Sequence, residues 1–313
     1  MIKSNPSFEY LYCFDDNFNK QAFTSIISLL DNVKKPIVIN VIHPNQFVYD
    51  KVPDLINKHI NLKKINFFLF KNSGYQFPNL LDNHVSEATY YRLFIDKYLE
   101  NNIENIVYID ADMICIDDPT NIIEDKIGYL KQNDQLISVK TELEYKYSDS
   151  DIFKRLELRK NYFNAGFMII NFKKWINDKV GEKLLEIMKD NYSKIVFWDQ
   201  DILNLYVNGT FLELDEKLNY SAQNLMENNI HDEKYIIHYV GSKKPWLTSG
   251  AFDISSEFYH TNFRKLYSSS YHVEHKWKIA SLKELFLAII KFKIFKINNP
   301  LLYIKDFIIS LRK

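Results

Sequence analysis

The chain has 313 residues, 46% hydrophobic and 26% charged, a globular composition that excludes extended disorder and suffices for one large α/β domain or two small ones. Its 40 Lys and Arg balance 40 Asp and Glu, so a general nucleic-acid binder is not expected. Cys13 and Cys115 fall in predicted strands, as reduced core cysteines of a cytosolic protein would. The N-terminus lacks the long apolar segment of a signal peptide, and no apolar run is long enough to span a bilayer.

Apolar strands alternate with amphipathic helices through the first 125 residues. Strands are predicted at 8–14, 36–42, 64–70 and 106–109, and helices at 21–30, 52–59 and 90–99. This alternation is typical of a parallel α/β sheet covered by helices.

Polar residues follow the first strand at Asp15, Asp16 and Asn17. A strand-to-loop junction of this kind could hydrogen-bond a nucleotide base. Because Asp and Asn also favour helix N-caps, capping of the next helix is the alternative. Arg92 presents a similar choice, since it could meet a phosphate or lie on the surface.

Two carboxylates, Asp110 and Asp112, follow the apolar strand 106–109. Buried strands rarely carry Asp unless it is paired or binds a metal. In open α/β sheets the carboxyl ends of the strands border the ligand crevice. Adjacent carboxylates suit Mg²⁺ or Mn²⁺, which would in turn hold a diphosphate. The alternative is a solvated acidic turn, because the same Asp-X-Asp spacing recurs twice later in the chain.

The second half adds a strand at 136–139, a helix or acceptor-side loop at 148–160, and helices at 172–189 and from Trp198 onward. The Asn164-Ala165-Gly166 break before an apolar strand predicts a close approach of backbone to ligand, or else a simple strand-entry turn. Acidic residues after Trp198 would also be favoured by the helix dipole alone.

A last polar group begins at His238, in an apolar strand, and continues to Gly241 and Lys244 in the following loop. A single His in such a strand is commonly a core residue, yet neutral imidazole is also a usual third ligand for Mn²⁺ beside carboxylates. The Lys, six residues on and past a Gly, suits neutralisation of a phosphate.

Five segments together resemble glycosyltransferase family 8, which includes bacterial lipo-oligosaccharide galactosyl- and glucosyltransferases and the glycogenins. The segments are Asp15–Asn17, Tyr108–Asp112, Tyr162–Gly166 with Asn171–Trp175, Asp199–Asn204 and His238–Trp246. The resemblance runs from about Phe8 to Trp246. It implies a GT-A fold, a Rossmann-like mostly parallel sheet flanked by helices. It also implies Mn²⁺ (or Mg²⁺) and retaining transfer of glucose or galactose from a UDP-hexose to a surface glycan or glycolipid.

Carried over position by position, the resemblance implies a role for each site residue. The implied metal ligands are Asp110, Asp112 and His238, of which Asp110 also faces the donor. The implied uracil and ribose contacts are Asp15, Asn17 and Phe18, and the implied diphosphate contacts are Gly241 and Lys244. The groups implied around the transferred sugar are His84, Arg92, Asn164, Asp199 and Gln200. The sequence departs from the family pattern at Lys140-Thr141-Glu142, since the family often has an Asp just after the strand predicted here at 136–139.

The implied catalytic residues are Asp199, Gln200 and Asp201. A retaining glycosidase uses a carboxylate nucleophile, but here the sugar-facing position holds Gln200, whose amide is a poor nucleophile. We therefore favour attack from the leaving-group face, with a diphosphate oxygen accepting the acceptor's proton; Asp201 is the nearby carboxylate that could act instead. Two alternatives to a transferase are a metal-dependent UDP-sugar hydrolase or nucleotidyltransferase, and a degenerate UDP-sugar-binding module.

The predicted catalytic domain covers residues 1–270, and residues 271–313 form a tail of different character. From His275 onward there are nine Lys and Arg against two acidic residues. Apolar residues recur at helical spacing on both sides of Pro300. A basic amphipathic pair predicts binding to an anionic membrane surface, hence a cytoplasmic protein peripheral on the inner face of the membrane. The alternative is two helices packed on the catalytic domain.

Overall fold

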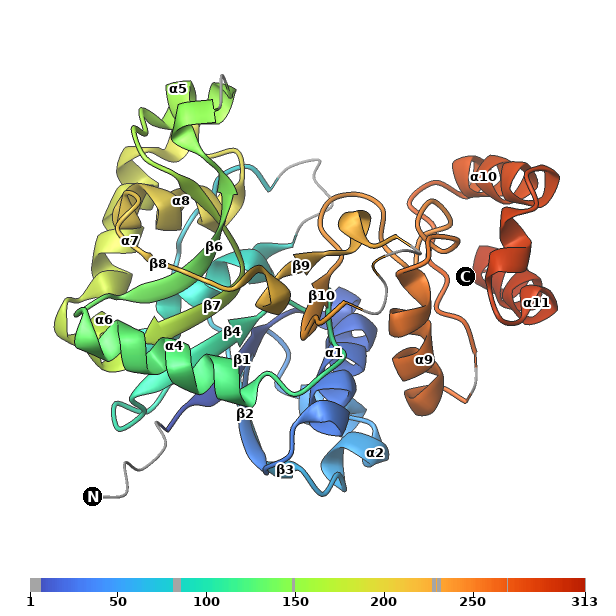
Figure 1. The fold of residues 1–313 in the computed structure, drawn as a ribbon, viewed down its shortest axis with the longest axis horizontal. Coiled ribbons are helices and arrows are strands. Elements are labelled where there is room, and N and C mark those ends of the chain that lie inside the picture. The colour runs from blue at the N-terminus through green and yellow to red at the C-terminus, as the bar shows by residue number, and fades with distance from the viewer. Residues whose placement is uncertain are drawn as a thin grey trace.

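The computed structural model describes residues 7–80, 86–147, 150–226, 229, 232–268 and 270–312. Its centre is a seven-stranded sheet of order β3-β2-β1-β4-β7-β6-β8 (Figure 1). The strands are β1 (Glu9–Cys13), β2 (Ile37–His43), β3 (Leu62–Leu69), β4 (Asn105–Ile109), β6 (Ile137–Leu143), β7 (Tyr162–Asn171) and β8 (Leu212–Glu213). The first four in spatial order are parallel, and β7 is antiparallel to both neighbours. The predicted mostly parallel α/β fold is confirmed.

Helices cover both faces of this sheet (Figure 1). One core contains α1 (Asn19–Asn32) and α4 (Thr120–Gln132), and the other contains α7 (Val180–Asp190) and α8 (Trp198–Val207). Strand β4 belongs to both cores, because successive side chains of a strand point to opposite faces. Its fully buried residues explain why the strand is apolar throughout and why polar residues begin only where it ends.

A second, three-stranded sheet brings distant parts of the chain to that end. It contains β5 (Met113–Cys115), β9 (Tyr220–Ser221) and β10 (Ile236–His238), with β10 in the middle. The antiparallel register pairs His238 with Met113, so it lies beside the residue that follows Asp112. Tyr239 N also donates to Asp112 O at 3.1 Å, which continues the pairing past the end of the strand.

Two predicted helices differ in form. The segment predicted at 90–99 is a 3₁₀ helix, Glu87–Phe94, followed by the short α3 (Ile95–Tyr98). A 3₁₀ helix eclipses side chains three residues apart, which places Thr89 and Arg92 on one face. The helix predicted at 172–189 is two helices, α6 (Phe172–Asn177) and α7, because Lys179 adopts a left-handed conformation with φ 52°.

The shorter predicted helices keep only part of their length. The prediction at 52–59 becomes the four-residue α2 (Asp54–Asn57), and α5 (Asp151–Leu156) lies within the segment 148–160. A further helix, α9 (Ser256–Leu266), packs beside α1 and leads toward the tail.

The tail forms α10 (Lys278–Ile290), a 3₁₀ turn at Lys293–Lys296, and α11 (Pro300–Leu311), which together stand at one end of the molecule (Figure 1). Its inner side chains share a hydrophobic cluster with Ala251 and Phe252 of the preceding chain and with Tyr271 at the start of the tail. Among the described residues, no helix combines the length and apolar character needed to cross a membrane.

Candidate active site

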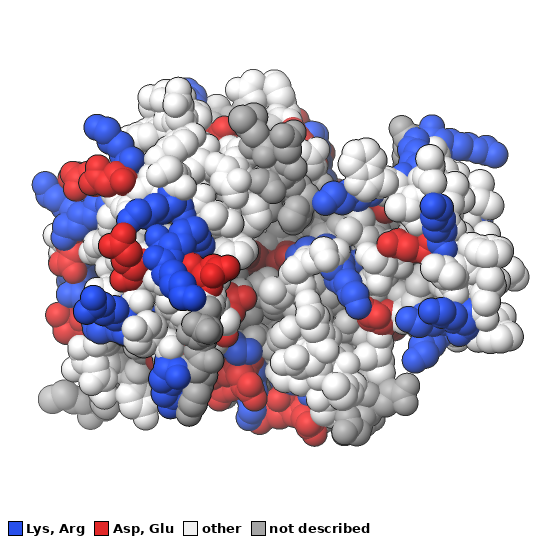
Figure 2. Space-filling view, turned by 90° about the horizontal axis from the view of Figure 1, so that it is seen from above, with Lys and Arg blue, Asp and Glu red and all other residues white. Residues whose placement is uncertain are grey.

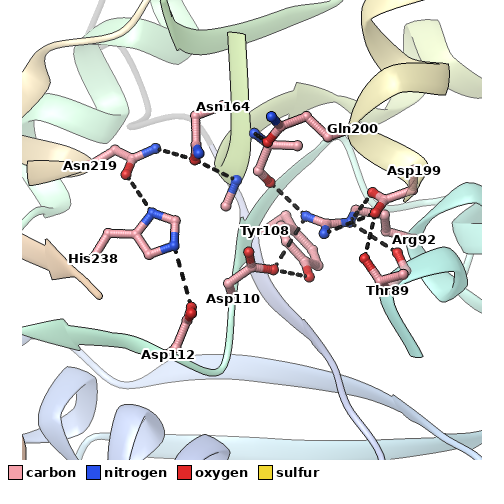
Figure 3. Close-up of polar contacts among 12 residues, drawn as sticks. Thr89, Arg92, Tyr108, Asp110, Asp112, Asn164, Asp199, Gln200, Asn219 and His238 are labelled. Carbon is pink, nitrogen blue, oxygen red and sulfur yellow. Dashed lines mark hydrogen bonds and ion pairs between the residues drawn. The ribbon is translucent and has the colours of Figure 1, made fainter. Parts of the chain in front are cut away.

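Three ligand-type side chains meet at the junction of the two sheets. Asp110 follows β4, Asp112 precedes β5, and His238 ends β10. One potential ligand atom from each lies within 4.8 Å of the others. Figure 3 shows this cluster beside the residues that hold it. The sheet registers therefore bring together the three residues predicted as metal ligands.

The hydrogen bonds around His238 suit a metal ligand. Its Nδ1 lies 2.9 Å from Asn219 Oδ1, while Asn219 Nδ2 donates to Asn164 Oδ1 at 3.0 Å. Because the Asn219 amide nitrogen faces Asn164, its oxygen must accept from His238 Nδ1–H. His238 Nε2 then carries a lone pair 3.4 Å from Asp112 Oδ1, a buried oxygen that accepts no hydrogen bond from a described residue. Two carboxylates and one free imidazole nitrogen form a donor set that fits a divalent cation.

The two carboxylates differ in their electrostatic surroundings. Burial raises the pKa of Asp110, and repulsion by Asp112 adds to this, although Arg92 opposes both. Burial also disfavours the charged form of Asp112, but the ammonium group of Lys244 outweighs it and lowers the pKa of Asp112. Lys244 Nζ lies 2.5 Å from Asp112 Oδ2. A cation between the carboxylates would favour ionisation of both.

Arg92 is an internal residue, 5% exposed, which excludes the surface alternative. Its Nε lies 2.5 Å from Asp199 Oδ2, and its Nη1 lies 3.3 Å from Asp110 Oδ1 and donates to Ala165 O. Thr89 donates to Asp199 from the same face of the 3₁₀ helix. Burial raises the pKa of Asp199 to about 6, against the opposing effect of Arg92. Arg92 therefore connects the metal-type carboxylate to Asp199 at the start of α8.

Gln200 is fixed at both ends of its amide. Its Oε1 accepts from Ala165 N at 2.9 Å, and its Nε2 donates to Glu142 Oε2 at 3.0 Å and to Tyr162 Oη at 3.2 Å. Asn164 Nδ2 approaches the same Glu142 oxygen at 3.4 Å. Glu142 thus lies among the predicted sugar-site residues, in the segment where the sequence departs from the family pattern.

The Asn164-Ala165-Gly166 segment passes so close to His238 that it has no room for a side chain at Gly166. A Cβ on Gly166 would lie 2.4 Å from the His238 ring, a distance that side chains cannot tolerate. Gly166 O also accepts from Asp110 N at 2.8 Å. The glycine therefore lets the backbone reach the cluster.

Asp201 occupies a different position, buried at the start of α8. Its carboxylate accepts from Val196 N and Phe197 N, both at 2.8 Å, and from Tyr162 Oη. Arg155 pairs with it at 2.7 Å. With these partners the Asp201 carboxylate serves a structural role, because it accepts hydrogen bonds from backbone N–H groups at the start of α8.

The predicted nucleoside contacts lie at the end of β1. Asp15 accepts from Asn17 N at 2.9 Å and so caps a short 3₁₀ turn, which agrees with the capping alternative in this conformation. Asn17 and Phe18 line a cavity of about 420 Å³ together with Gly241 and Lys244. His84, which was predicted to lie near the transferred sugar, falls outside the described residues.

Four further residues complete the site without having been singled out by the sequence patterns. They are Thr89, Tyr108, Tyr162 and Asn219, which hydrogen-bond to Asp199, Asp110, Gln200 and His238 respectively. Tyr108 and Tyr162 lay within segments that resemble the family, but no local signal pointed to Asn219.

The fold and the site define a class of α/β protein in which side chains able to hold a divalent cation gather at the carboxyl end of a central strand, next to a ligand-sized cavity. The sequence profile of Glycosyl transferase family 8 matches residues 8–250, and the chain belongs to this family. The predicted family membership is confirmed, and so is the predicted GT-A fold.

Relatives of known name agree with this assignment. Lipopolysaccharide 1,3-galactosyltransferase of Salmonella typhimurium is 30% identical over 55% of this chain and 52% of its own length. Lipopolysaccharide 1,2-glucosyltransferase of Escherichia coli is 26% identical over 78% of this chain and 75% of its own. The chain thus spans about half of the first relative and three quarters of the second. Galactosyltransferase LgtC, solved with donor and acceptor sugar analogs, superposes with a TM-score of 0.69 at 19% identity, over 87% of this chain and 99% of that one.

Proposed function

We propose that the protein is a Mn²⁺-dependent retaining hexosyltransferase that moves glucose or galactose from a UDP-sugar to a surface glycan or glycolipid. The observation that carries the proposal is the meeting of Asp110, Asp112 and His238 beside the cavity lined by Gly241 and Lys244. Galactosyl- and glucosyltransferases acting on lipopolysaccharide among the relatives support the choice of hexose and acceptor class.

One set of residues would act on the diphosphate leaving group, and another set would contact the transferred sugar. When bound, the cation would neutralise the diphosphate and stabilise the departing UDP. Lys244, held at Asp112 and bordering the cavity, adds a second positive charge for the same group. Arg92 keeps Asp110 and Asp199 in fixed positions, and Gln200, Asn164 and Glu142 offer polar groups to sugar hydroxyls.

The geometry supports attack from the leaving-group face. The Gln200 amide is a weak nucleophile with both ends already hydrogen-bonded. Asp201 would have to leave Arg155 and two backbone donors before it could attack a sugar carbon. A diphosphate oxygen of the donor is then the base that receives the acceptor's proton.

Binding and turnover with a panel of nucleotide sugars test the proposal. UDP-glucose, UDP-galactose and UDP-N-acetyl sugars are screened by thermal shift with and without Mn²⁺, followed by assays for hydrolysis and for transfer to lipopolysaccharide cores. Transfer supports the proposal. Hydrolysis that no acceptor diverts into a glycoside favours the hydrolase, and binding without turnover favours the binding module.

Retention of configuration is a direct consequence of the proposed mechanism. We expect an α-linked product from an α-configured UDP-hexose and no covalent sugar adduct on Gln200. NMR coupling constants of the product report the linkage, and intact-protein mass spectrometry reports an adduct. A β-linked product would exclude this mechanism.

Replacing Asn219 with Leu should weaken metal binding without removing a ligand. Leu is similar in size but cannot accept from His238 Nδ1–H, so the ring loses the contact that fixes its orientation. Changes to such supporting contacts typically cost 10–100-fold in metal affinity, and we expect a loss in this range by calorimetric titration with Mn²⁺. The matched control is Asn262→Leu, which removes a part-buried amide from α9. Equal Mn²⁺ affinity in the two variants would contradict the role of Asn219.

We also propose that residues 1–270 form the catalytic domain, and that residues 271–313 bind the anionic inner face of the cytoplasmic membrane. The tail exposes large apolar side chains on the side away from its own core. Trp277, Ile279, Phe286, Phe292, Phe295 and Leu301 are between 63% and 79% exposed. In Figure 2 the tail lies at the right, and its Lys and Arg residues (blue) are spread among other residues drawn in white. Exposed apolar side chains mixed with basic ones suit an interfacial helix.

A further inference from the structure

The tail does not leave the catalytic body directly after α9. Between α9 and α10, residues 271–276 form a segment, here called the return segment, that runs back along the loop carrying Lys244. Glu274 N donates to Trp246 O at 2.8 Å, and Glu274 forms a parallel bridge with Leu247. The His272 ring stacks on Trp246. The return segment is therefore fixed to the loop that borders the cation site.

The same segment is also tied to α1, which contributes Gln21 to the cavity wall. Glu274 Oε1 accepts from Gln21 Nε2 at 3.2 Å, and His272 Nε2 lies 2.8 Å from the same oxygen. Gln21 is buried in α1, in the first turn after Asn17 and Phe18. One carboxylate thus joins the predicted nucleoside side to the return segment.

The end of the return segment lines the cavity of about 420 Å³ through Glu274, His275 and Lys276. This is the cavity that Asn17 and Lys244 line, and both of these residues are predicted to bind the donor. The cavity wall therefore comes from four separate parts of the chain, which are residues 17–21, Ser86, residues 241–247 and residues 274–276. Lys276 brings a second ammonium group to a cavity that already contains Lys244, while Glu274 is engaged by Gln21 and His272.

His275 connects this wall to the tail. Its Nε2 lies 2.7 Å from Ser310 Oγ, and its ring packs edge-on against Phe307 at 4.8 Å, both on α11. Tyr271 N also donates to Asp306 of α11 at 2.7 Å. The position of α11 thus determines where the return segment meets the cavity.

We propose that Glu274–Lys276 are part of the donor site, where Lys276 contacts the nucleoside diphosphate, with α11 acting as the element that positions this segment. This inference rests on the proposed function and deepens it. Lys276 supplies positive charge to the anionic ligand, and His275 transmits the position of α11. The tail is then a component of substrate binding as well as the proposed membrane contact.

The test is calorimetric titration of the full-length protein with UDP in the presence of Mn²⁺ and without lipid. Because Lys276 is exposed and its attraction is screened, we expect Lys276→Ala to weaken UDP binding about two- to fivefold. Lys283→Ala removes the same charge from an exposed site on α10 outside the cavity and should bind UDP as the wild type does.

A second pair of variants tests positioning by α11. Ser310 does not line the cavity, and its hydroxyl contacts His275 and Phe307 O of its own helix, so Ser310→Ala reaches the UDP site through α11 and His275. We expect Ser310→Ala and His275→Ala each to weaken UDP binding. The loss of binding free energy in the double variant should be smaller than the sum of the losses in the two single variants, because both changes act through the same contact. Unchanged melting temperatures separate this effect from loss of folding.

The outcomes distinguish this inference from the proposed function. If the wild type fails to bind UDP with Mn²⁺, the proposed function itself is wrong. If the wild type binds UDP but Lys276→Ala and Ser310→Ala match Lys283→Ala, the return segment is no part of the donor site and the inference alone is overturned.

Discussion

Replacing Asp112 with Asn is expected to abolish sugar transfer while leaving the fold intact. Asp112 is the carboxylate shared by His238 and Lys244, and Asn has the same shape but no charge to hold a cation between them. Since loss of a residue that merely supports a ligand costs 10–100-fold, loss of a ligand should reduce transfer by more than about a hundredfold. Mn²⁺-dependent UDP binding should fall with it.

The measurement is initial transfer rate and calorimetric UDP binding, with circular dichroism as the check on folding. Asp125→Asn is the matched control, because Asp125 is exposed on α4 and away from the cluster. Wild-type protein in excess chelator should reproduce the Asp112→Asn result. Full activity of the variant, or of the wild type in chelator, would show that the metal assignment is wrong.

Charge in the tail is expected to control attachment to lipid. Each basic residue near an anionic surface contributes roughly 1 kcal/mol. Replacing Lys291, Lys293 and Lys296 with Gln should therefore weaken vesicle binding by up to about 3 kcal/mol, roughly a hundredfold in partition coefficient. Attachment should also be released by high salt, because the Debye length is only about 8 Å at physiological ionic strength.

Co-sedimentation with vesicles of anionic or neutral lipid, at low and high salt, measures this effect. The matched control replaces three exposed lysines of the catalytic body, Lys63, Lys183 and Lys189, with Gln. It removes the same charge from a surface without the apolar side chains of the tail. If the full-length protein stays in the supernatant with anionic vesicles at low salt, the membrane proposal is wrong.

The fold explains why point variants are preferable to truncation for this test. Cutting the chain near Tyr271 would remove the return segment and uncover Ala251 and Phe252, which share a cluster with Tyr303 and Phe307. The resulting exposure of apolar surface would lower stability whether or not the tail binds lipid. The two alternatives for the tail are therefore compatible, since its inner side packs on the protein while its outer side exposes Trp277 and Phe292.

The sequence by itself determined most strands of the central sheet and marked the three clustered residues as candidates through local patterns, and the resemblance to family 8 then implied that they are metal ligands. The apolar run before Asp110 predicts a buried strand, and a carboxylate placed just after such a strand must lie at its exposed end. His238 ends an apolar strand in the same way. The positions of these strands and of the polar residues that follow them can be predicted from periodicity and residue type over a few neighbouring positions, so the prediction does not require the tertiary fold.

Only the tertiary structure decided which side chains support those residues. Asn219 reaches His238 because β9 and β10 pair in parallel, and Glu142 reaches Gln200 because β6 continues four residues beyond its predicted end. Lys179 splits a predicted helix by adopting a left-handed conformation that its residue type does not favour. Each of these features depends on strand register or packing between residues far apart in sequence. Such long-range geometry leaves no periodic trace in the chain, which is why the supporting contacts and the return segment of the tail appear only in the folded molecule.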